Sequence, residues 1–221
     1  MNTAALRQLI QRAHQHEATT GQLARQLGAQ LERLHPSIRL PVDDAQGVLE
    51  RFVAAYIEQV PELLDAAAAV AREAGISAQI KPVLKIAEDY FLQPQAILDG
   101  HDGLDGLDGL LDEAYLAHRL VEEMNDRYIG QFGQALIPMD TTVANLIAHQ
   151  LIGEEFANRL DDAVHLTVEG MLDPRHFDPQ LLQAYREQLD DPQVVAAWQN
   201  WPCLSRHLGV ELELTQEQRV A

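Results

Sequence analysis

The sequence predicts an all-α fold, a multi-helix bundle built from one chain of 221 residues. Alanine and leucine dominate the composition, whereas aromatic residues make up only 5% of it. The first two favour helices, while aromatic and β-branched residues favour strands. Apolar residues also recur three and four positions apart along most of the chain, which is the period of one helix face. Proline and glycine separate these stretches, as they do between helices.

Residues 1–40 predict an N-terminal helical hairpin. Thr19-Thr20-Gly21-Gln22 offers a Thr-x-x-Gln capping box to start its second helix, and His35-Pro36 would end that helix. The second helix carries an apolar stripe formed by Leu23, Leu27, Leu31 and Leu34. An isolated hairpin cannot bury such a stripe, so we expect these leucines to interact with the body of the protein, a second copy or another protein.

Residues 41–175 predict the helical core domain. Asp43 or Asp44 would cap a third helix, because apolar residues then recur in pairs every four positions from Val48 to Ile57. Proline favours the first helical turn, and glycine favours the position just after a helix. We therefore expect a fourth helix from Pro61 to Gly75 and a fifth that opens at Pro82.

The central pair of the core is expected at 110–129 and 141–171, where apolar spacing of three and four residues continues longest. Gly153 is expected to bend the second of these helices. Residues 176–221 predict a C-terminal helical extension, with short helices at 178–190 and 193–201. The tail at 210–214 alternates apolar and acidic residues as a strand does, but no second strand is evident.

An acidic Asp-Gly-rich loop is predicted between two core helices, at residues 98–113. The candidate metal ligands in it are Asp99, Asp102, Asp105, Asp108, Asp112 and Glu113. Ca²⁺ takes six to eight oxygen ligands from flexible loops, although the spacing is not that of an EF-hand. In the alternative interpretation Asp108 caps the next helix, and Asp112 and Glu113 lie favourably in its positive first turn.

A second candidate metal site lies on one helix face. Asp161, His165 and Glu169 follow one another at spacings of four residues. They would bind Zn²⁺ or Fe²⁺ if another helix completed the ligand set. In the alternative interpretation this face is a boundary surface, because it lies about 100° around the helix from the apolar line. That line contains Leu160, Val164 and Val168.

Residues 85–124 resemble the YkvA-like family of small bacterial helical domains of unknown function. The matching residues are Tyr90, Phe91, Pro94, Ile97, Asp99, Gly109, Asp112 and Ala114. The sequence departs from the family pattern at Gln95-Ala96, at Leu98 and at Glu113, and the Asp-Gly repeats resemble an insertion. The resemblance implies a helix–acidic loop–helix unit, no established reaction, and a role near membranes or in protein assembly.

Charge is distributed unevenly in this acidic chain. The net charge is −18, yet residues 1–40 carry five arginines against Glu17 and Glu32. A surface this negative repels phosphate backbones, so we expect no nucleic-acid partner. The single cysteine, Cys203, excludes an internal disulfide and suits a reducing compartment. No apolar run is long enough to span a membrane, and the start lacks a signal-peptide core, so we expect a cytoplasmic protein.

Three functions remain open at the level of sequence. The leading hypothesis is a non-catalytic protein–protein interaction module, with a protein partner or a homo-oligomer, because no complete catalytic set, Walker loop or dinucleotide-binding motif is present. The alternative is a metal-binding protein or metal-dependent enzyme that uses the acidic loop or the His165 face, with a divalent metal as its cofactor. The third is peripheral membrane contact through the basic N-terminal helix.

Overall fold

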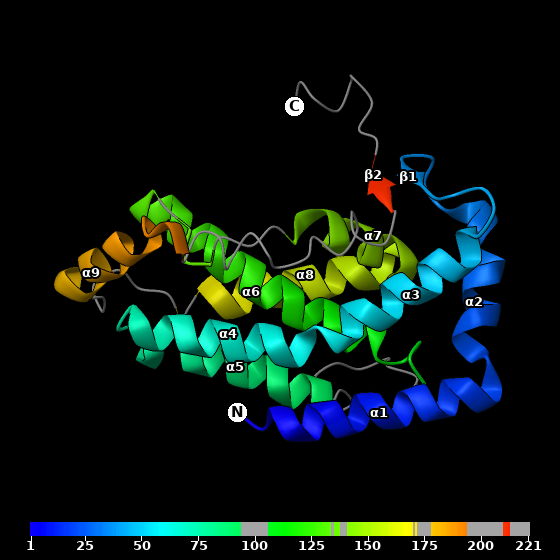
Figure 1. The fold of residues 1–221 in the computed structure, drawn as a ribbon, viewed down its shortest axis with the longest axis horizontal. Helices are drawn as coiled ribbons and strands as arrows, with labels where there is room; N and C mark the ends of the chain where they lie inside the picture. Colours follow the sequence, from blue (N-terminus) through cyan, green and yellow to red (C-terminus); the bar gives the residue numbers. More distant parts are fainter. Residues whose placement is uncertain are drawn as a thin grey trace.

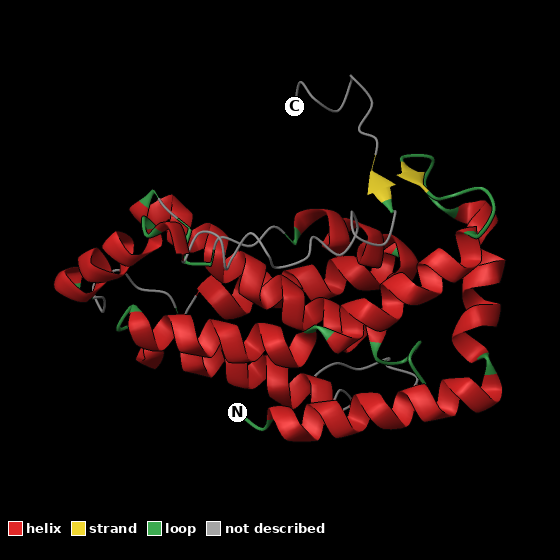
Figure 2. Ribbon diagram, in the orientation of Figure 1, coloured by secondary structure: helices red, strands yellow, loops and turns green. Residues whose placement is uncertain are grey.

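The computed structural model describes residues 1–93, 106–133, 135–137, 141–169, 171, 178–193 and 210–212. Its architecture is all-α, as the sequence predicts (Figures 1 and 2). The helices are α1 (Thr3–Thr20), α2 (Gln22–Gln30), the 3-10 turn η1 (Leu31–Arg33), α3 (Ala45–Glu58), α4 (Val60–Glu73), α5 (Ser77–Leu92), α6 (Leu111–Phe132), α7 (Thr142–Ile152), α8 (Glu154–Glu169) and α9 (Pro179–Leu189). None of the described helices is long and apolar enough to cross a bilayer.

Helix α6 is the central element of the bundle. It contacts α3, α4, α5, α7 and α8, so it is surrounded by other helices (Figure 1). Its apolar residues are accordingly buried on several sides, among them Ala114, Leu120 and Met124. Helix α6 thus matches the core helix expected at 110–129, packed on the helices of residues 43–91, whereas the partner expected at 141–171 is divided into α7 and α8.

The N-terminal hairpin is not confirmed. Helix α1 packs against α4 and α5, whereas α2 turns away from it and packs against α3 (Figure 1). Gly21 joins the two helices with a φ of +59°, a conformation that favours glycine. The leucine stripe nevertheless packs on the body of the protein. Leu23 and Leu27 are buried, and Leu31 and Leu34 are partly buried against the same core.

The predicted Thr-x-x-Gln capping box is wrong. Thr19 and Thr20 still belong to α1, and their hydroxyls donate to the carbonyl of His16 one turn earlier. Glu17 caps α2 instead, because its carboxylate accepts hydrogen bonds from the backbone N–H groups of Leu23 at 2.9 Å and Ala24 at 3.3 Å. The side chain of a residue in the last turn of α1 thus caps the N-terminus of α2.

Two other helix boundaries differ from the expectation. The fifth helix begins at Ser77, so Pro82 lies inside α5 rather than at its start. The expected long helix at 141–171 is two helices, α7 and α8, because Gly153 adopts a φ of +101° and breaks the chain direction. The expectations for Pro61 and Gly75 are confirmed: Pro61 lies in the first turn of α4, and Gly75 follows that helix with a positive φ.

The C-terminal part returns to the body of the protein. Helix α9 confirms the helix expected at 178–190, and the Tyr185 hydroxyl donates to the Leu136 carbonyl at 2.6 Å. Most of the second expected helix, at 193–201, lies outside the described residues. Strand β2 (Glu211–Leu212) confirms a strand in the tail, and it pairs antiparallel with β1 (Ile38–Arg39), which the sequence did not predict. One hydrophobic cluster contains residues from all three predicted segments, whose boundaries at 40 and 175 stay predictions.

Candidate binding cavity

Two polar stripes, on α6 and α7, line one open side of this apolar bundle. On α6 the stripe consists of Tyr115, Arg119, Glu122 and Asp126, at helical spacings of four, three and four residues. On α7 it consists of Thr142, Asn145 and His149, at spacings of three and four residues. Together with Asp161 of α8 and the turn before β1, they line an open cavity of about 580 Å³.

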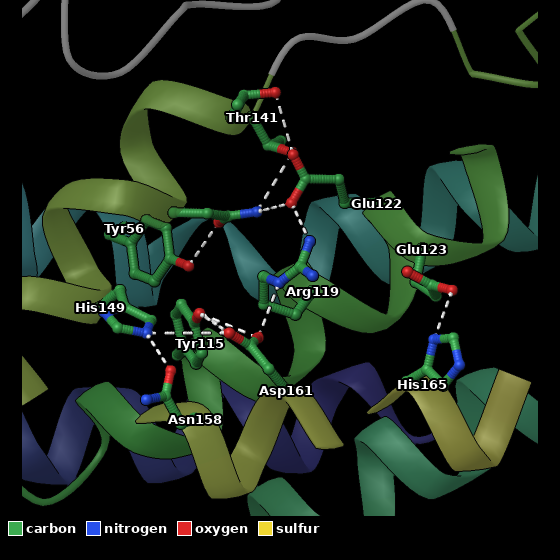
Figure 3. Close-up of polar contacts among 12 residues, drawn as sticks. Tyr56, Tyr115, Arg119, Glu122, Glu123, Thr141, His149, Asn158, Asp161 and His165 are labelled. Carbon is green, nitrogen blue, oxygen red and sulfur yellow. Dashed lines mark hydrogen bonds and ion pairs between the residues drawn. The ribbon is translucent and has the colours of Figure 1, made fainter. Parts of the chain in front are cut away.

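Arg119 is the cation at the centre of this cavity (Figure 3). Its Nε donates to Asp161 Oδ1 at 2.9 Å, and its Nη1 donates to Glu122 Oε2. Burial alone would lower the pKa of Arg119, but the hydrogen bonds to both carboxylates raise it above the ordinary value, so the guanidinium stays charged. The residue therefore joins α6 to α8.

Glu122 connects the cavity to two further helices. Its Oε1 accepts from the Thr142 hydroxyl at 3.0 Å, and its Oε2 accepts from Asn145 Nδ2 at 2.6 Å. Asn145 in turn accepts a hydrogen bond from the hydroxyl of Tyr56 on α3 at 2.7 Å. These bonds hold α3, α6 and α7 in one network, so the carboxylate of Glu122 has a fixed orientation.

Asp161 also accepts a hydrogen bond from a second residue of α6, Tyr115. The Tyr115 hydroxyl lies 3.0 Å from both of its carboxylate oxygens. Burial, followed by the charge of Asp161, raises the pKa of Tyr115, so the phenol stays protonated and donates. His149 Nε2 lies 3.8 Å from Asp161 Oδ2 and 3.1 Å from Asn158 Oδ1. The imidazole thus forms a hydrogen bond with Asn158 and lies near the carboxylate of Asp161 at the edge of the cavity.

Asp126 differs from the other carboxylates of the cavity. It is exposed, and its side chain forms no hydrogen bond or ion pair with any residue that the structure describes. Partial burial raises its pKa, and the negative charges of Glu122 and Glu123 raise it further, while Arg119 acts in the opposite direction. With the histidines neutral, the lining has three carboxylates and one guanidinium, an excess of two negative charges.

A buried aromatic pair lies behind this network. His118 stacks on Tyr56 with ring centroids 4.0 Å apart, and its Nε2 lies 3.0 Å from the Tyr56 carbonyl oxygen. The imidazole is fully buried, and burial lowers its pKa to about 4. His118 is therefore neutral near pH 7 and supports the wall of the cavity as a core residue.

The metal site expected at Asp161, His165 and Glu169 is not assembled. Asp161 faces the cavity, whereas His165 is exposed and lies 3.5 Å from Glu123 and 4.0 Å from Glu169 (Figure 3). The Nη2 of Arg127 also lies 3.2 Å from His165 Nδ1 and occupies the same side of the ring. Among the described residues, no group of three His, Cys, Asp or Glu side chains is arranged to hold a metal ion.

The predicted acidic loop is described only in part, because Asp99, Asp102 and Asp105 lie outside the described residues. Asp108 does not cap α6. Its Oδ2 instead accepts from Gln22 Nε2 at 2.8 Å. Asp112 and Glu113 do lie in the first turn of α6, as the alternative interpretation expects. Burial raises the pKa of Asp112 to about 7, helped by the charge of Asp108, and it also raises the pKa of Glu113.

Of the residues that line the cavity, only Asp161 belongs to a metal site predicted from the sequence. The signal that would have found them is the polar stripe on α6, which has the same period as the apolar stripe beside it. Polar side chains repeated at helical spacing on a central helix of a bundle are costly to bury unless they bond to one another. That repetition is a reason to expect an internal polar site.

A scan of protein-family models found no match to this chain, and searches of curated proteins and of solved structures found no similar protein. The resemblance of residues 85–124 to the YkvA-like family therefore stays a prediction.

Proposed function

We propose that this protein is a non-catalytic interaction module, and that the cavity between α6, α7 and α8 receives a lysine or arginine side chain of a basic protein partner. The observation that carries the proposal is the charge of the cavity lining, with Glu122, Asp126 and Asp161 against Arg119. A cavity with two excess negative charges favours a cationic occupant and disfavours an anionic one.

The arrangement of Arg119 supports a cationic occupant. Its guanidinium already donates to Glu122 and Asp161, so an entering anion would have to compete with both carboxylates. Asp126 is the acceptor that these bonds leave for a ligand, because it lies at the exposed rim. A cation placed there would also favour the charged form of this carboxyl, whose pKa is raised by partial burial and then by repulsion from Glu122 and Glu123.

The rim supports a long side chain as the occupant. Leu146 lines the cavity and is 45% exposed, beside the polar residues of α7. Lysine and arginine carry an apolar stem that packs on such a surface while the charged end reaches a carboxylate. The net charge of −18 would in addition attract a basic partner from a distance, which raises association rates.

The proposal can be tested with a fluorescein-labelled peptide of alternating lysine and alanine, and with a glutamate–alanine peptide as its control. We expect fluorescence anisotropy to show saturable binding of the lysine peptide alone. Asp126→Asn should weaken this binding about fivefold, since an exposed charge pair contributes up to about 1 kcal/mol. Glu154→Gln, which removes an exposed charge of α8 outside the cavity, should change it less than twofold.

Two outcomes would overturn the proposal. If both variants weakened binding equally, the peptide would be responding to net charge rather than to the cavity. If the lysine peptide failed to bind at low ionic strength, the cavity would not be a site for cationic side chains.

A further inference from the structure

A second cavity, of about 550 Å³, opens between α4 and α5, in a different part of the bundle. Its polar lining consists of Asp65 and Arg72 from α4 and of Ser77 and Lys81 from α5. The rest of the lining is apolar and comes from alanines of α4, Leu84 and Met1. The cavity thus combines charged side chains with a wall that accepts an organic group.

The cations of this cavity are not neutralised by their neighbours. Arg72 and Lys81 are exposed, and neither side chain forms a hydrogen bond or ion pair in the part of the chain that the structure describes. Asp65 is already paired, because Arg7 Nη2 lies 3.4 Å from its Oδ2. In a chain of net charge −18, the cavity is therefore a local site of positive charge.

The start of α5 adds to this positive charge. Ser77 is the first residue of the helix, and Lys81 follows one turn later on the same face. The residue before the helix is Ile76, whose apolar side chain cannot accept a hydrogen bond from the N–H groups of the first turn. Uncapped N–H groups and the helix dipole favour an anion at this end, and the Ser77 hydroxyl offers another donor.

We propose that this second cavity binds a small organic dianion, namely a phosphate monoester. The phosphate would lie between Arg72 and Lys81, near Ser77, and its organic group would contact the alanines of α4 and Leu84. Arginine and lysine both bind phosphate groups, and two cations match the two charges of a monoester. This cavity lies elsewhere in the bundle than the first one, and its proposed ligand is negatively rather than positively charged. The two proposals are therefore independent of each other.

The experiment is a titration of the whole protein with phenyl phosphate, followed by two-dimensional ¹H–¹⁵N NMR. We expect saturable shifts of the backbone amides of Ser77, Ala78 and Lys81. The double variant Arg72→Gln plus Lys81→Gln should bind at least about tenfold more weakly. The matched control, Arg12→Gln plus Arg33→Gln, removes two exposed charges outside the cavity and should bind within about twofold of the unaltered protein.

Two further ligands test the charge and the organic group separately: benzoate has the ring with a single charge, and inorganic phosphate has no ring. Benzoate should bind more weakly than phenyl phosphate, because it carries one charge, and inorganic phosphate should bind more weakly because it lacks the ring. The proposal is wrong if phenyl phosphate causes no saturable shift at Ser77 and Lys81. It is also wrong if both double variants lose binding equally, or if benzoate binds as tightly as phenyl phosphate.

Discussion

Arg119 on α6 and Asp161 on α8 form an ion pair, with 2.9 Å between Nε and Oδ1, and this pair fixes the geometry of the first cavity. Both side chains are more than two-thirds buried, so solvent screens their attraction less than it would at an exposed site. The same guanidinium also pairs with Glu122. Its charge is therefore shared between two carboxylates, whereas Asp126 at the rim has no such partner among the described residues.

Replacing Arg119 should destabilise the protein strongly. In Arg119→Gln, the carboxylates of Glu122 and Asp161 would lose their common cation in a partly buried site. We expect the free energy of unfolding to fall by about 2–4 kcal/mol, as measured by urea denaturation near pH 7. Arg12→Gln, at an exposed position of α1, should change it by less than about 0.5 kcal/mol. An Arg119 variant as stable as this control would contradict the role assigned to the network.

His118 should make stability fall under mildly acidic conditions. Its pKa is about 4 in the folded protein and about 6.5 in the unfolded chain, so the unfolded chain binds more protons between these values. The stabilisation is fully present above pH 6.5 and is lost as the pH falls toward 4. From pH 7 to pH 5, the unaltered protein should therefore lose about 2 kcal/mol more than His118→Phe. Parallel denaturation curves at both pH values measure this difference, and equal losses would show that His118 protonates freely in the fold.

Asp112 should make the free energy of unfolding fall as the pH rises, which is opposite to the effect of His118. Its folded pKa of about 7 lies above the ordinary value of 3.8, so its stabilising effect is present at low pH and is lost as the pH rises through 7. Between pH 5 and pH 8, the free energy of unfolding of the unaltered protein should fall by about 3 kcal/mol relative to Asp112→Asn. In Asp190→Asn, a variant at an exposed position that keeps Asp112, the free energy of unfolding should fall with pH as it does in the unaltered protein. If the free energy of unfolding fell equally in Asp112→Asn and Asp190→Asn, a group other than Asp112 would be responsible for the pH dependence.

The leucine stripe should be needed for stability rather than left free for a partner. Leu27 is 2% exposed, and Leu31 packs on the same core. Leu27→Asp plus Leu31→Asp would place two charges against apolar surface, so we expect a loss of more than about 4 kcal/mol. Arg25→Gln plus Arg33→Gln should cost less than about 1 kcal/mol. Thermal melts and light scattering of both double variants check this, and a leucine variant with native mass and melting temperature would refute it.

The helical class was predictable because each helix carries its own periodic apolar face. The pairs between Val48 and Ile57 in α3 and the spacing of α6 are local signals, and they lead directly to buried residues. Helix starts were less predictable. The side chain that accepts hydrogen bonds from the first N–H groups of a helix need not be adjacent to that helix in sequence. Glu17 starts α2 from the preceding helix, and Asp108 bonds to Gln22 instead of capping α6.

The first cavity was not predictable residue by residue, because its contacts join positions far apart in the chain. Arg119 and Asp161 are 42 residues apart, and Tyr56 and Asn145 are 89 apart. Spacing within one helix therefore grouped Asp161 with His165 and Glu169, its nearest neighbours on that face. The packing of α6 against α8 selected Arg119 and Tyr115 as its partners instead.

The most direct test of the central claim is a ¹H–¹⁵N NMR titration of the whole protein with Nα-acetyl-lysine methylamide, a single blocked lysine. We expect saturable shifts at the backbone amides of Asp126 and Leu146 and at the side-chain amide of Asn145, with none at Ser77 or Lys81. Asp126→Asn should weaken these shifts, and Glu154→Gln should leave them unchanged. Shifts spread over the acidic surface, without saturation at these residues, would contradict the claim that the first cavity receives a cationic side chain.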